Sequence, residues 1–163
     1  MDTGKALDKS TWTLVDLARR QAKAYGDREF MSFEHGTRLT FASVDTISGQ
    51  LARNLAGLGV QPGDRVLALL KNRAEFILAM LATMKLGAIF VPVNTELKGA
   101  FLEHQLRNAE PRVVFVDASL SDAFEGIEGG TGNLATTVYV AGDVDLPLPP
   151  VLAGAPAMTF EQL

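Results

Sequence analysis

Three short apolar runs in the middle of the chain predict the strands of a buried parallel sheet. The runs are RVLALL at 65–70, AIFVPV at 88–93 and RVVFVD at 112–117, and such continuous hydrophobicity is typical of strands covered on both faces. The segments between them predict one helix that begins at residue 72 and a second over about 97–108. Strands and helices in alternation indicate right-handed crossovers. The sequence therefore predicts an α/β fold, a mainly parallel βαβαβ sheet with flanking helices, in which these three strands are neighbours.

The N-terminal part of the chain is predicted to add two helices and a β-hairpin. Apolar positions recur at helical spacing over 14–25, and Gly26 follows as the C-cap. Two β-like runs, REFMSF and TRLTF, flank the turn EHG at 34–36, whose glycine suits an N-terminal β-hairpin. Thr40 is predicted to N-cap the next helix. Ser43 stands where a capping box has Glu or Gln, so this cap is expected to be incomplete.

The alternation weakens after the third strand. A short helix is expected up to about Phe124, then a loop over 126–133 and one more strand, TTVYV, at 136–140. Residues 141–158 hold four of the seven prolines, so we expect an extended surface segment there rather than an element of the core. The last residues, MTFEQL at 158–163, are typical of the first turn of a helix.

Composition sets the broad class. The 163 residues are 47% hydrophobic, which is enough for one domain over 1–163 with its own core. Lys and Arg number 15 against 19 Asp and Glu, and the net charge of −4 disfavours nucleic acid as a partner. The chain has no cysteine, which excludes disulfides and cysteine zinc sites. It begins without an apolar signal segment, and its longest apolar stretch is far shorter than the ~20 residues of a membrane span. We therefore expect a cytoplasmic protein with no membrane span.

The turn at Asn72 joins the first strand of the sheet to its helix, a place where α/β units often hold a phosphate. Such a cradle needs glycines, and for ATP usually a lysine, but LLKNRAEF contains no glycine. Asn72 and Glu75 have instead the spacing of a capping box, in which each side chain accepts from the backbone N–H of the other. The residues that follow are apolar nearly all round, which predicts a helix buried between two layers. We therefore expect Asn72 to be a helix cap.

The remaining candidates for chemistry are weaker. GTGNLA at 130–135 matches a dinucleotide fingerprint in its letters, but it precedes a strand instead of following one, so a loop is expected. His35 and His104 lie in different elements without a partner at metal-ligand spacing, and surface positions are expected for both. Asp143 and Asp145 fall in the proline-rich segment and are expected to be solvated. We assign no catalytic, no cofactor-binding and no metal-binding residue.

The run GVQPGDRVLALLKNRAEFILAMLATMKLGAIFVPVNTELKGAFLEHQLRNAEPRVVFVD, residues 59–117, resembles the N-terminal part of the adenylate-forming superfamily, in particular the acyl-CoA synthetases. The similarity begins near TLVDLARR and returns at MTFEQL. In that family the turn PGD at 62–64, the pair Asn72 and Glu75, and VPVN at 91–94 recur as scaffold.

This resemblance implies a reaction in two steps. A carboxylic acid attacks the α-phosphate of ATP, with Mg²⁺, to give an acyl-adenylate and pyrophosphate, and the thiol of CoA then displaces AMP. The phosphate loop of the family, T-S-G-T-T-G-x-P-K, is expected shortly after Leu163, and its other catalytic motifs later. The carboxylic acid, aliphatic, aromatic or carnitine-like, is left open.

The chain is accordingly expected to be the N-terminal subdomain of a larger adenylate-forming enzyme, inactive alone and binding none of ATP, Mg²⁺ or CoA. It is also expected to self-associate through exposed apolar surface. For Lys98 two interpretations stand: a contact to a CoA phosphate, or a solvated lysine at a helix start. The second is favoured, so Lys98 is not assigned as a site.

Two alternatives of other classes stay open. One is a complete small flavodoxin-like α/β module that holds a ligand at the carboxyl ends of its strands. The other is an interaction domain without small-molecule chemistry. The first lacks a glycine-rich turn after RVLALL or RVVFVD, and the second has no positive signature beyond acidity. The reading frame beyond Leu163 would discriminate, because a phosphate-loop motif favours the synthetase and a stop codon favours the alternatives.

Overall fold

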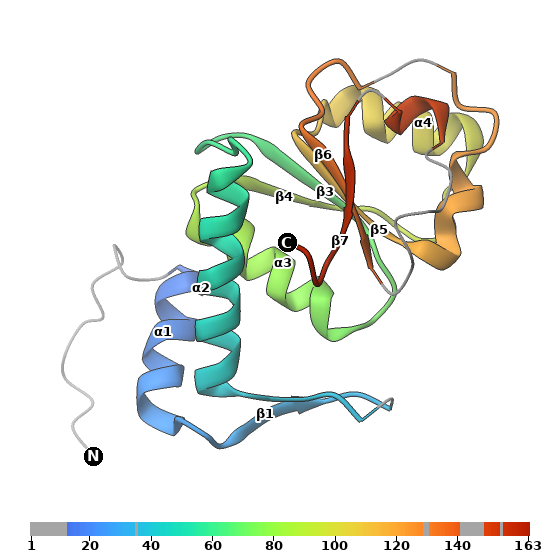
Figure 1. Ribbon diagram of the computed structural model, residues 1–163. Coiled ribbons are helices and arrows are strands. Elements are labelled where there is room, and N and C mark those ends of the chain that lie inside the picture. The colour runs from blue at the N-terminus through green and yellow to red at the C-terminus, as the bar shows by residue number, and fades with distance from the viewer. Residues whose placement is uncertain (1–12, 35, 129–130, 141–148, 154) are drawn as a thin grey trace.

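The computed structural model describes residues 13–34, 36–128, 131–140, 149–153 and 155–163 (Figure 1). In this part of the chain the helical segments are α1 (Leu14–Tyr25), α2 (Phe41–Gly57), α3 (Ala74–Lys85), α4 (Gly99–Ala109) and the 3₁₀ segments η2 (Ala118–Phe124) and η3 (Pro150–Leu152). The strands are β1 (Glu29–Ser32), β2 (Arg38–Thr40), β3 (Arg65–Leu69), β4 (Ile89–Pro92), β5 (Val113–Asp117), β6 (Thr136–Val140) and β7 (Ala157–Thr159). None of the described helices is long and apolar enough to cross a membrane.

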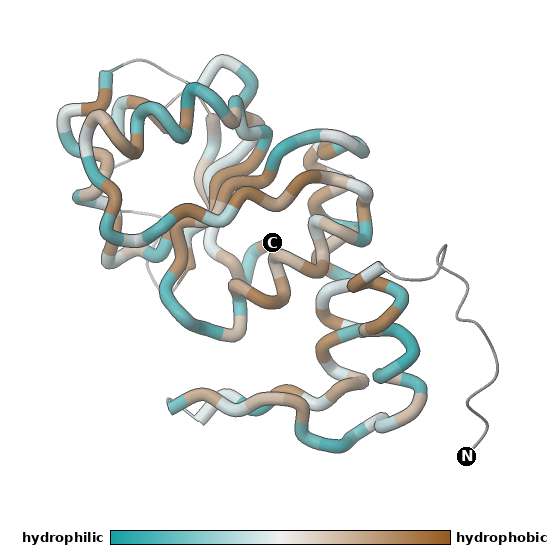
Figure 2. The backbone as a smooth tube through the Cα atoms, turned by 180° about the vertical axis from the view of Figure 1, so that it is seen from behind, coloured by the Kyte–Doolittle hydropathy of each residue, from teal (hydrophilic) through white to brown (hydrophobic). Residues whose placement is uncertain are grey.

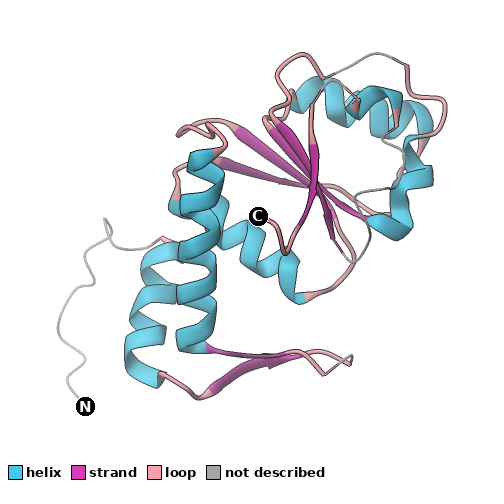
Figure 3. Cartoon of the chain, viewed as in Figure 1, coloured by secondary structure: helices cyan, strands magenta, loops and turns pink. Residues whose placement is uncertain are grey.

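Within the described residues the central sheet has five strands in the order β4-β3-β5-β6-β7, and all their pairings are parallel (Figure 3). Val66 of β3 is in register with Phe90 of β4 on one side and with Val113 of β5 on the other. The three strands predicted to be parallel neighbours are therefore confirmed. The chain then moves outward from β5 through β6 to β7, which forms one edge of the sheet, and β4 forms the other.

Each face of the sheet carries a helical layer because side chains of a strand alternate between the two faces. Val66 and Ala68 of β3 pack in one core with α2 and α3, and α3 lies between the sheet and α2 (Figure 1). Leu67 and Leu69 pack on the opposite face with α4, η2 and η3. All four side chains are fully buried, and Figure 2 shows hydrophobic residues gathered along the strands. The predicted α/β class and the buried position of α3 are confirmed.

The N-terminal elements agree with the sequence in outline. Helix α1 ends at Tyr25, and Gly26 follows with a φ of 52°, a left-handed conformation that suits glycine. Strands β1 and β2 pair antiparallel as the predicted hairpin, with Gly36 at a φ of 88° in the turn. His35 of that turn lies outside the described residues. Helix α2 begins after Thr40, as expected.

Two predicted helix caps are corrected. The cap of α2 is complete, because Thr40 Oγ1 accepts from the N–H of Ser43 at 3.0 Å while Ser43 Oγ accepts from the N–H of Thr40 at 2.8 Å. A hydroxyl thus does what Glu or Gln does in most capping boxes. Asn72, by contrast, is not a cap. Helix α3 begins at Ala74, so Arg73 rather than Asn72 holds the N-cap position, with no side-chain cap hydrogen bond. Glu75 accepts a hydrogen bond from the Arg73 side chain instead.

The proline-rich segment is also corrected where it is described. Pro150–Leu152 forms η3, in which Val151 and Leu152 are buried in the core, and Ala157–Thr159 adds a parallel strand to the sheet. The chain after this strand forms turns rather than the predicted start of a helix. Proline is compatible with these positions because it suits the first turn of a helical segment and because Pro156 lies before the edge strand rather than within it.

Candidate functional site

The carboxyl edge of the sheet is the first place to look, since ligands of open α/β sheets bind in a crevice beyond the carboxyl ends of the strands. From β3 the chain crosses to β4 on one side and later reaches β5 on the other. If β3 is numbered as strand 1, the strand order is 2-1-3-4-5, which is the flavodoxin-like order. In this order the topological switch point, where the direction of the connections reverses, lies between strands 1 and 3, here β3 and β5. The candidate crevice therefore lies where β3 and β5 end.

An ion pair of the chain's own residues fills this switch point. Arg73 donates from Nη1 to Oδ2 of Asp117 at 2.9 Å and from Nε to Oε2 of Glu75 at 2.8 Å. The other carboxylate oxygen of Asp117 accepts from the hydroxyl of Ser119 at 2.7 Å and from its N–H at 3.2 Å. The side chains of Asp117 and Arg73 are only 5% and 25% exposed. The pair occupies the place where a cofactor phosphate would approach the strand ends.

The charges of this pair are stabilised by their surroundings. Burial raises the pKa of Asp117, but hydrogen bonds from Ser119 and the hydrogen bond and charge of Arg73 outweigh it and hold that pKa below its usual range. Burial lowers the pKa of Arg73, but the hydrogen bonds and charges of Glu75 and Asp117 outweigh it and raise that pKa. Both groups are charged at neutral pH, whereas a general acid or base needs a pKa near the working pH. The pair is suited to holding α3 against β5, not to proton transfer.

An open hollow of about 520 Å³ lies between the ends of β3 and β4. It is lined by Leu70, Lys71, Asn72, Phe76, Pro92, Val93, Asn94 and Thr95. Lys71, Asn72 and Asn94 are exposed, and Oδ1 of Asn94 accepts from the N–H of Glu96 at 3.0 Å. One ammonium group and two amides can hold a polar or anionic group, and the lining contains no carboxylate or imidazole to act as a general base. Asn72 thus lines a surface hollow.

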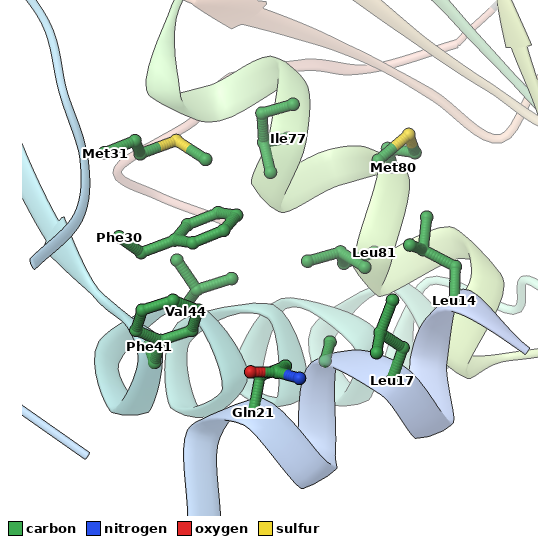
Figure 4. Close-up of a pocket in the computed structure, with 11 residues that line it drawn as sticks. Leu14, Leu17, Gln21, Phe30, Met31, Phe41, Val44, Ile77, Met80 and Leu81 are labelled. Atoms are coloured by element: carbon green, nitrogen blue, oxygen red, sulfur yellow. The ribbon is translucent and has the colours of Figure 1, made fainter. Parts of the chain in front are cut away.

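A second hollow, which we call the apolar pocket, lies among α1, the hairpin, α2 and α3 and has a volume of about 190 Å³. It is lined by Leu14, Leu17, Ala18, Gln21, Phe30, Met31, Phe41, Val44, Ile77, Met80 and Leu81. Figure 4 shows these side chains pointing toward a common space, with the amide of Gln21 as the polar group. Leu14, Leu17 and Phe30 are each 44% exposed, so the space opens to solvent. The apolar pocket has no titratable side chain and supports binding of an apolar group rather than catalysis.

His104 and Lys98, which were also weighed from the sequence, do not line these hollows. His104 is exposed on α4, as expected, and Lys98 is exposed immediately before that helix without a side-chain cap hydrogen bond. Residues 131–135, the described part of the GTGNLA match, form a turn that leads into β6, as expected. Asp143 and Asp145 lie outside the described residues. Within the described part of the chain, no group of three or more His, Asp or Glu could hold a metal ion.

Sequence reasoning missed Arg73 and Asp117 as partners. A signal was present, because each follows or ends an apolar strand run, and the carboxyl ends of parallel strands meet at one edge of a sheet. The sequence predicted the three strands as neighbours but not their order, so it did not show that β3 lies between β4 and β5.

Comparison with known proteins gives the family. The model of the AMP-binding enzyme family matches residues 18–152. The chain belongs to this family. Among curated relatives, the medium/long-chain-fatty-acid–CoA ligase FadD6 of Mycobacterium tuberculosis is 34% identical over 125 residues, which cover 77% of this chain and 21% of the relative. The crotonobetaine/carnitine–CoA ligase of Salmonella paratyphi A is 28% identical over 126 residues, which cover 75% and 24%.

Solved structures agree with this assignment. A putative long-chain-fatty-acid CoA ligase from Rhodopseudomonas palustris superposes with a TM-score of 0.74 at 29% identity, covering 93% of this chain and 40% of that one. The anthranilate CoA ligase AuaEII, in complex with anthranoyl-AMP, gives a TM-score of 0.73 at 29% identity, covering 82% and 26%. The expected resemblance and fold are therefore confirmed. As an AMP-binding family member, the chain spans about a fifth of the length of a curated relative such as FadD6.

Proposed function

We propose that this chain is the N-terminal part of an ATP-dependent acyl-CoA ligase, which joins a carboxylic acid to CoA through an acyl-adenylate and releases AMP and pyrophosphate. The observation that carries the proposal is the family match over residues 18–152, made together with relatives that are named acid–CoA ligases. ATP, Mg²⁺ and CoA are the cofactors of the proposed reaction. Its substrate is a small carboxylic acid, for which aliphatic, aromatic and carnitine-like compounds are equal candidates.

Within such an enzyme we assign this chain the role of scaffold. Adenylation requires a metal and positioned donors that stabilise charge on the phosphates, usually the largest catalytic contribution. The switch point of the sheet is instead filled by Arg73 and Asp117, and the lining of the two hollows contains no carboxylate that could hold a metal and no imidazole. The proposal is therefore that the catalytic groups lie in further parts of a longer protein and that the 163-residue chain alone neither binds MgATP tightly nor forms an acyl-adenylate.

The test compares the 163-residue chain with the product of the complete reading frame. Pyrophosphate release is measured with MgATP and a panel of fatty, aromatic and betaine-type carboxylic acids, and thioester formation is measured after CoA is added. Isothermal titration of the short chain with MgATP accompanies the assay.

We expect acid-dependent pyrophosphate release from the longer product and none from the short chain, and the preferred acid names the substrate class. Micromolar affinity for MgATP or turnover by the short chain would contradict the scaffold role. A reading frame that stops at Leu163 would contradict the ligase proposal itself.

The strand order favours one second candidate, a complete flavodoxin-like binding module that holds a ligand beyond β3 and β5. The filled switch point speaks against it, because a ligand there would have to displace the Arg73–Asp117 pair. Resonance shifts of Ser119 and Arg73 on addition of a flavin nucleotide, with no catalytic activity in a longer product, would favour this candidate over the ligase.

A further inference from the structure

Gly49 lies in the middle of α2, although its backbone does not require a glycine. The helix runs from Phe41 to Gly57, and the φ of Gly49 is not positive. Glycine is the poorest helix former after proline, so its presence needs another reason. A Cβ built on Gly49 would lie 3.7 Å from Nζ of Lys85 and 3.9 Å from Nη1 of Arg53. The missing methyl group leaves a space beside which two cationic groups converge.

Lys85 reaches this space from α3 with a charge that is almost fully buried. Its side chain is 7% exposed, and Nζ donates to the carbonyl oxygen of Asp45 at 2.7 Å and to Oδ1 of the same residue at 2.6 Å. An ammonium group carries three donors. One N–H of Lys85 is therefore left without an acceptor among the described residues. A buried cation with an unused donor favours a further anionic partner.

Two arginines line the same hollow, Arg53 from the next turn of α2 and Arg19 from α1. Arg53 donates from Nη2 to Oε1 of Gln50 at 2.6 Å, which leaves its Nη1 group beside Gly49. Arg19 of α1 lines the same open hollow, whose volume is about 500 Å³. Among the described residues that line this hollow, only Asp45 is acidic, so three cations face one carboxylate in a chain whose net charge is −4. We call Arg19, Gly49, Arg53 and Lys85 the Gly49 cradle.

We propose that the Gly49 cradle binds the phosphate group of a small molecule. A phosphate monoester carries close to two negative charges at neutral pH and three acceptor oxygens, which matches the unused donors of Lys85 and Arg53. The guanidinium fork of Arg53 contacts a phosphate in bidentate fashion, and Lys85 acts as a point charge. The absent Cβ lets the anion approach the helix surface. The site is independent of the adenylation proposed above and needs no part of the chain beyond the described residues.

The test is a titration of the isotope-labelled 163-residue chain followed by nuclear magnetic resonance. Inorganic phosphate, glycerol 3-phosphate and acetate are added separately at constant ionic strength, with chloride as the balancing anion. We expect saturable shifts of the Gly49 amide and the Arg53 guanidinium with the two phosphates and not with acetate. The two phosphate arms distinguish a free ion from a monoester as the ligand.

Matched variants separate binding from stability. Gly49→Ala places a methyl group between Nζ of Lys85 and Nη1 of Arg53, where the anion would approach the helix. Since alanine is a better helix former than glycine, the variant should keep or raise the melting temperature while it weakens phosphate binding about tenfold or more. Gly57→Ala is the control, because a Cβ at Gly57 would meet nothing within 4 Å, and it should leave binding unchanged. Arg53→Gln should also weaken binding, and Arg107→Gln on α4 should not.

Unchanged phosphate affinity in Gly49→Ala or in Arg53→Gln would overturn the proposal. So would shifts that do not saturate, or that acetate produces equally, because they would indicate a general salt effect. If Gly49→Ala lowers the melting temperature and the wild type shows no phosphate response, Gly49 only makes room for the Lys85–Asp45 contact and the site does not exist.

Discussion

At the scale of single residues, the ion pair of Asp117 and Arg73 fills the carboxyl edge of the sheet between β3 and β5. The two residues are 44 positions apart in the chain, and their side chains meet at 2.9 Å where β3 and β5 end. Asp117 has little access to water, so removal of its charge would leave the guanidinium of Arg73 without its buried partner. We therefore infer that this ion pair stabilises the packing of α3 on the sheet.

Asp117→Asn should lower the free energy of unfolding by about 2 kcal/mol at neutral pH, since it removes one charge of a largely buried pair. The pKa of Asp117 is lowered in the folded protein, so its stabilisation is fully present above the unfolded-state value of about 3.9 and is lost as the pH falls through the folded-state pKa. The difference between variant and wild type should thus be wide at pH 7 and narrow progressively below about pH 4. Urea unfolding of both proteins at several pH values measures this difference in the free energy of unfolding.

Glu29→Gln is the matched control for this prediction. Glu29 also pairs with an arginine, Arg38, but the two side chains are 50% and 76% exposed, so the change should stay within about 0.5 kcal/mol. A loss in Asp117→Asn that is the same at all pH values would show that the carboxylate charge is not what stabilises α3.

Neighbouring threonines of β6 offer a second test at this scale. Both are fully buried, but Thr136 Oγ1 donates to the carbonyl oxygen of Pro156 at 2.9 Å, whereas Thr137 Oγ1 has no partner among the described residues. The isosteric change to valine should therefore lower the free energy of unfolding by about 1 kcal/mol at Thr136 and raise it by a similar amount at Thr137. Denaturant unfolding of both variants decides the matter, and effects of the same sign would contradict it.

At the scale of elements, the N-terminus of α2 is held by a reciprocal pair of hydrogen bonds between Thr40 and Ser43. This pair satisfies two backbone N–H groups that a helix start would otherwise leave without partners. It also fixes the angle at which β2 enters α2, because Thr40 ends the strand and caps the helix. The orientation of the hairpin relative to α2 therefore depends on this cap.

Thr40→Ala should lower the free energy of unfolding by about 1 kcal/mol, the usual cost of losing an N-cap. Thr46→Ala in the same helix is the control, because Thr46 is exposed in the helix interior and alanine is the better helix former there. Thr40→Ala should thus lower the melting temperature, and Thr46→Ala should raise it. Equal effects would mean that the cap makes no net contribution to stability.

At the scale of the whole molecule, large apolar side chains remain exposed on several elements. Leu14, Leu17 and Phe30 surround the mouth of the apolar pocket, Ile89 on edge strand β4 is 52% exposed, and Phe101 on α4 is 75% exposed. Clustered apolar surface of this kind marks contact with another surface, whereas single exposed residues need no explanation. The cluster at the apolar pocket is therefore the place where we expect association.

We predict that the isolated chain self-associates through this cluster. Sedimentation velocity at micromolar concentrations should show a weight-average mass that rises with concentration. Leu14→Gln combined with Leu17→Gln should reduce this rise, and Phe101→Gln, at a single exposed residue, should not. A stable monomer over a wide range of dilution would contradict the prediction.

The sequence by itself determined the elements whose signals are local. Continuous apolar runs predicted β3, β4 and β5. Gly26 predicted the end of α1, and Thr40 predicted the start of α2. Both kinds of signal depend on residues that are close together in the chain. The family resemblance rested on the same local order. Even here Ser43 was misjudged, since the length of a side chain alone does not decide whether it reaches an N–H.

Only the tertiary structure decided the contacts between distant elements. The Arg73–Asp117 pair spans 44 positions and the Lys85–Asp45 pair 40, and neither exists until the crossovers bring β5 beside β3 and α3 beside α2. The burial of Val151 and Leu152 likewise depends on a sheet face already formed by other strands. A composition rich in proline predicts the local backbone conformation, whereas burial depends on which elements pack against the segment. In the same way, the distant partner of a charged side chain cannot be predicted from its neighbours along the chain.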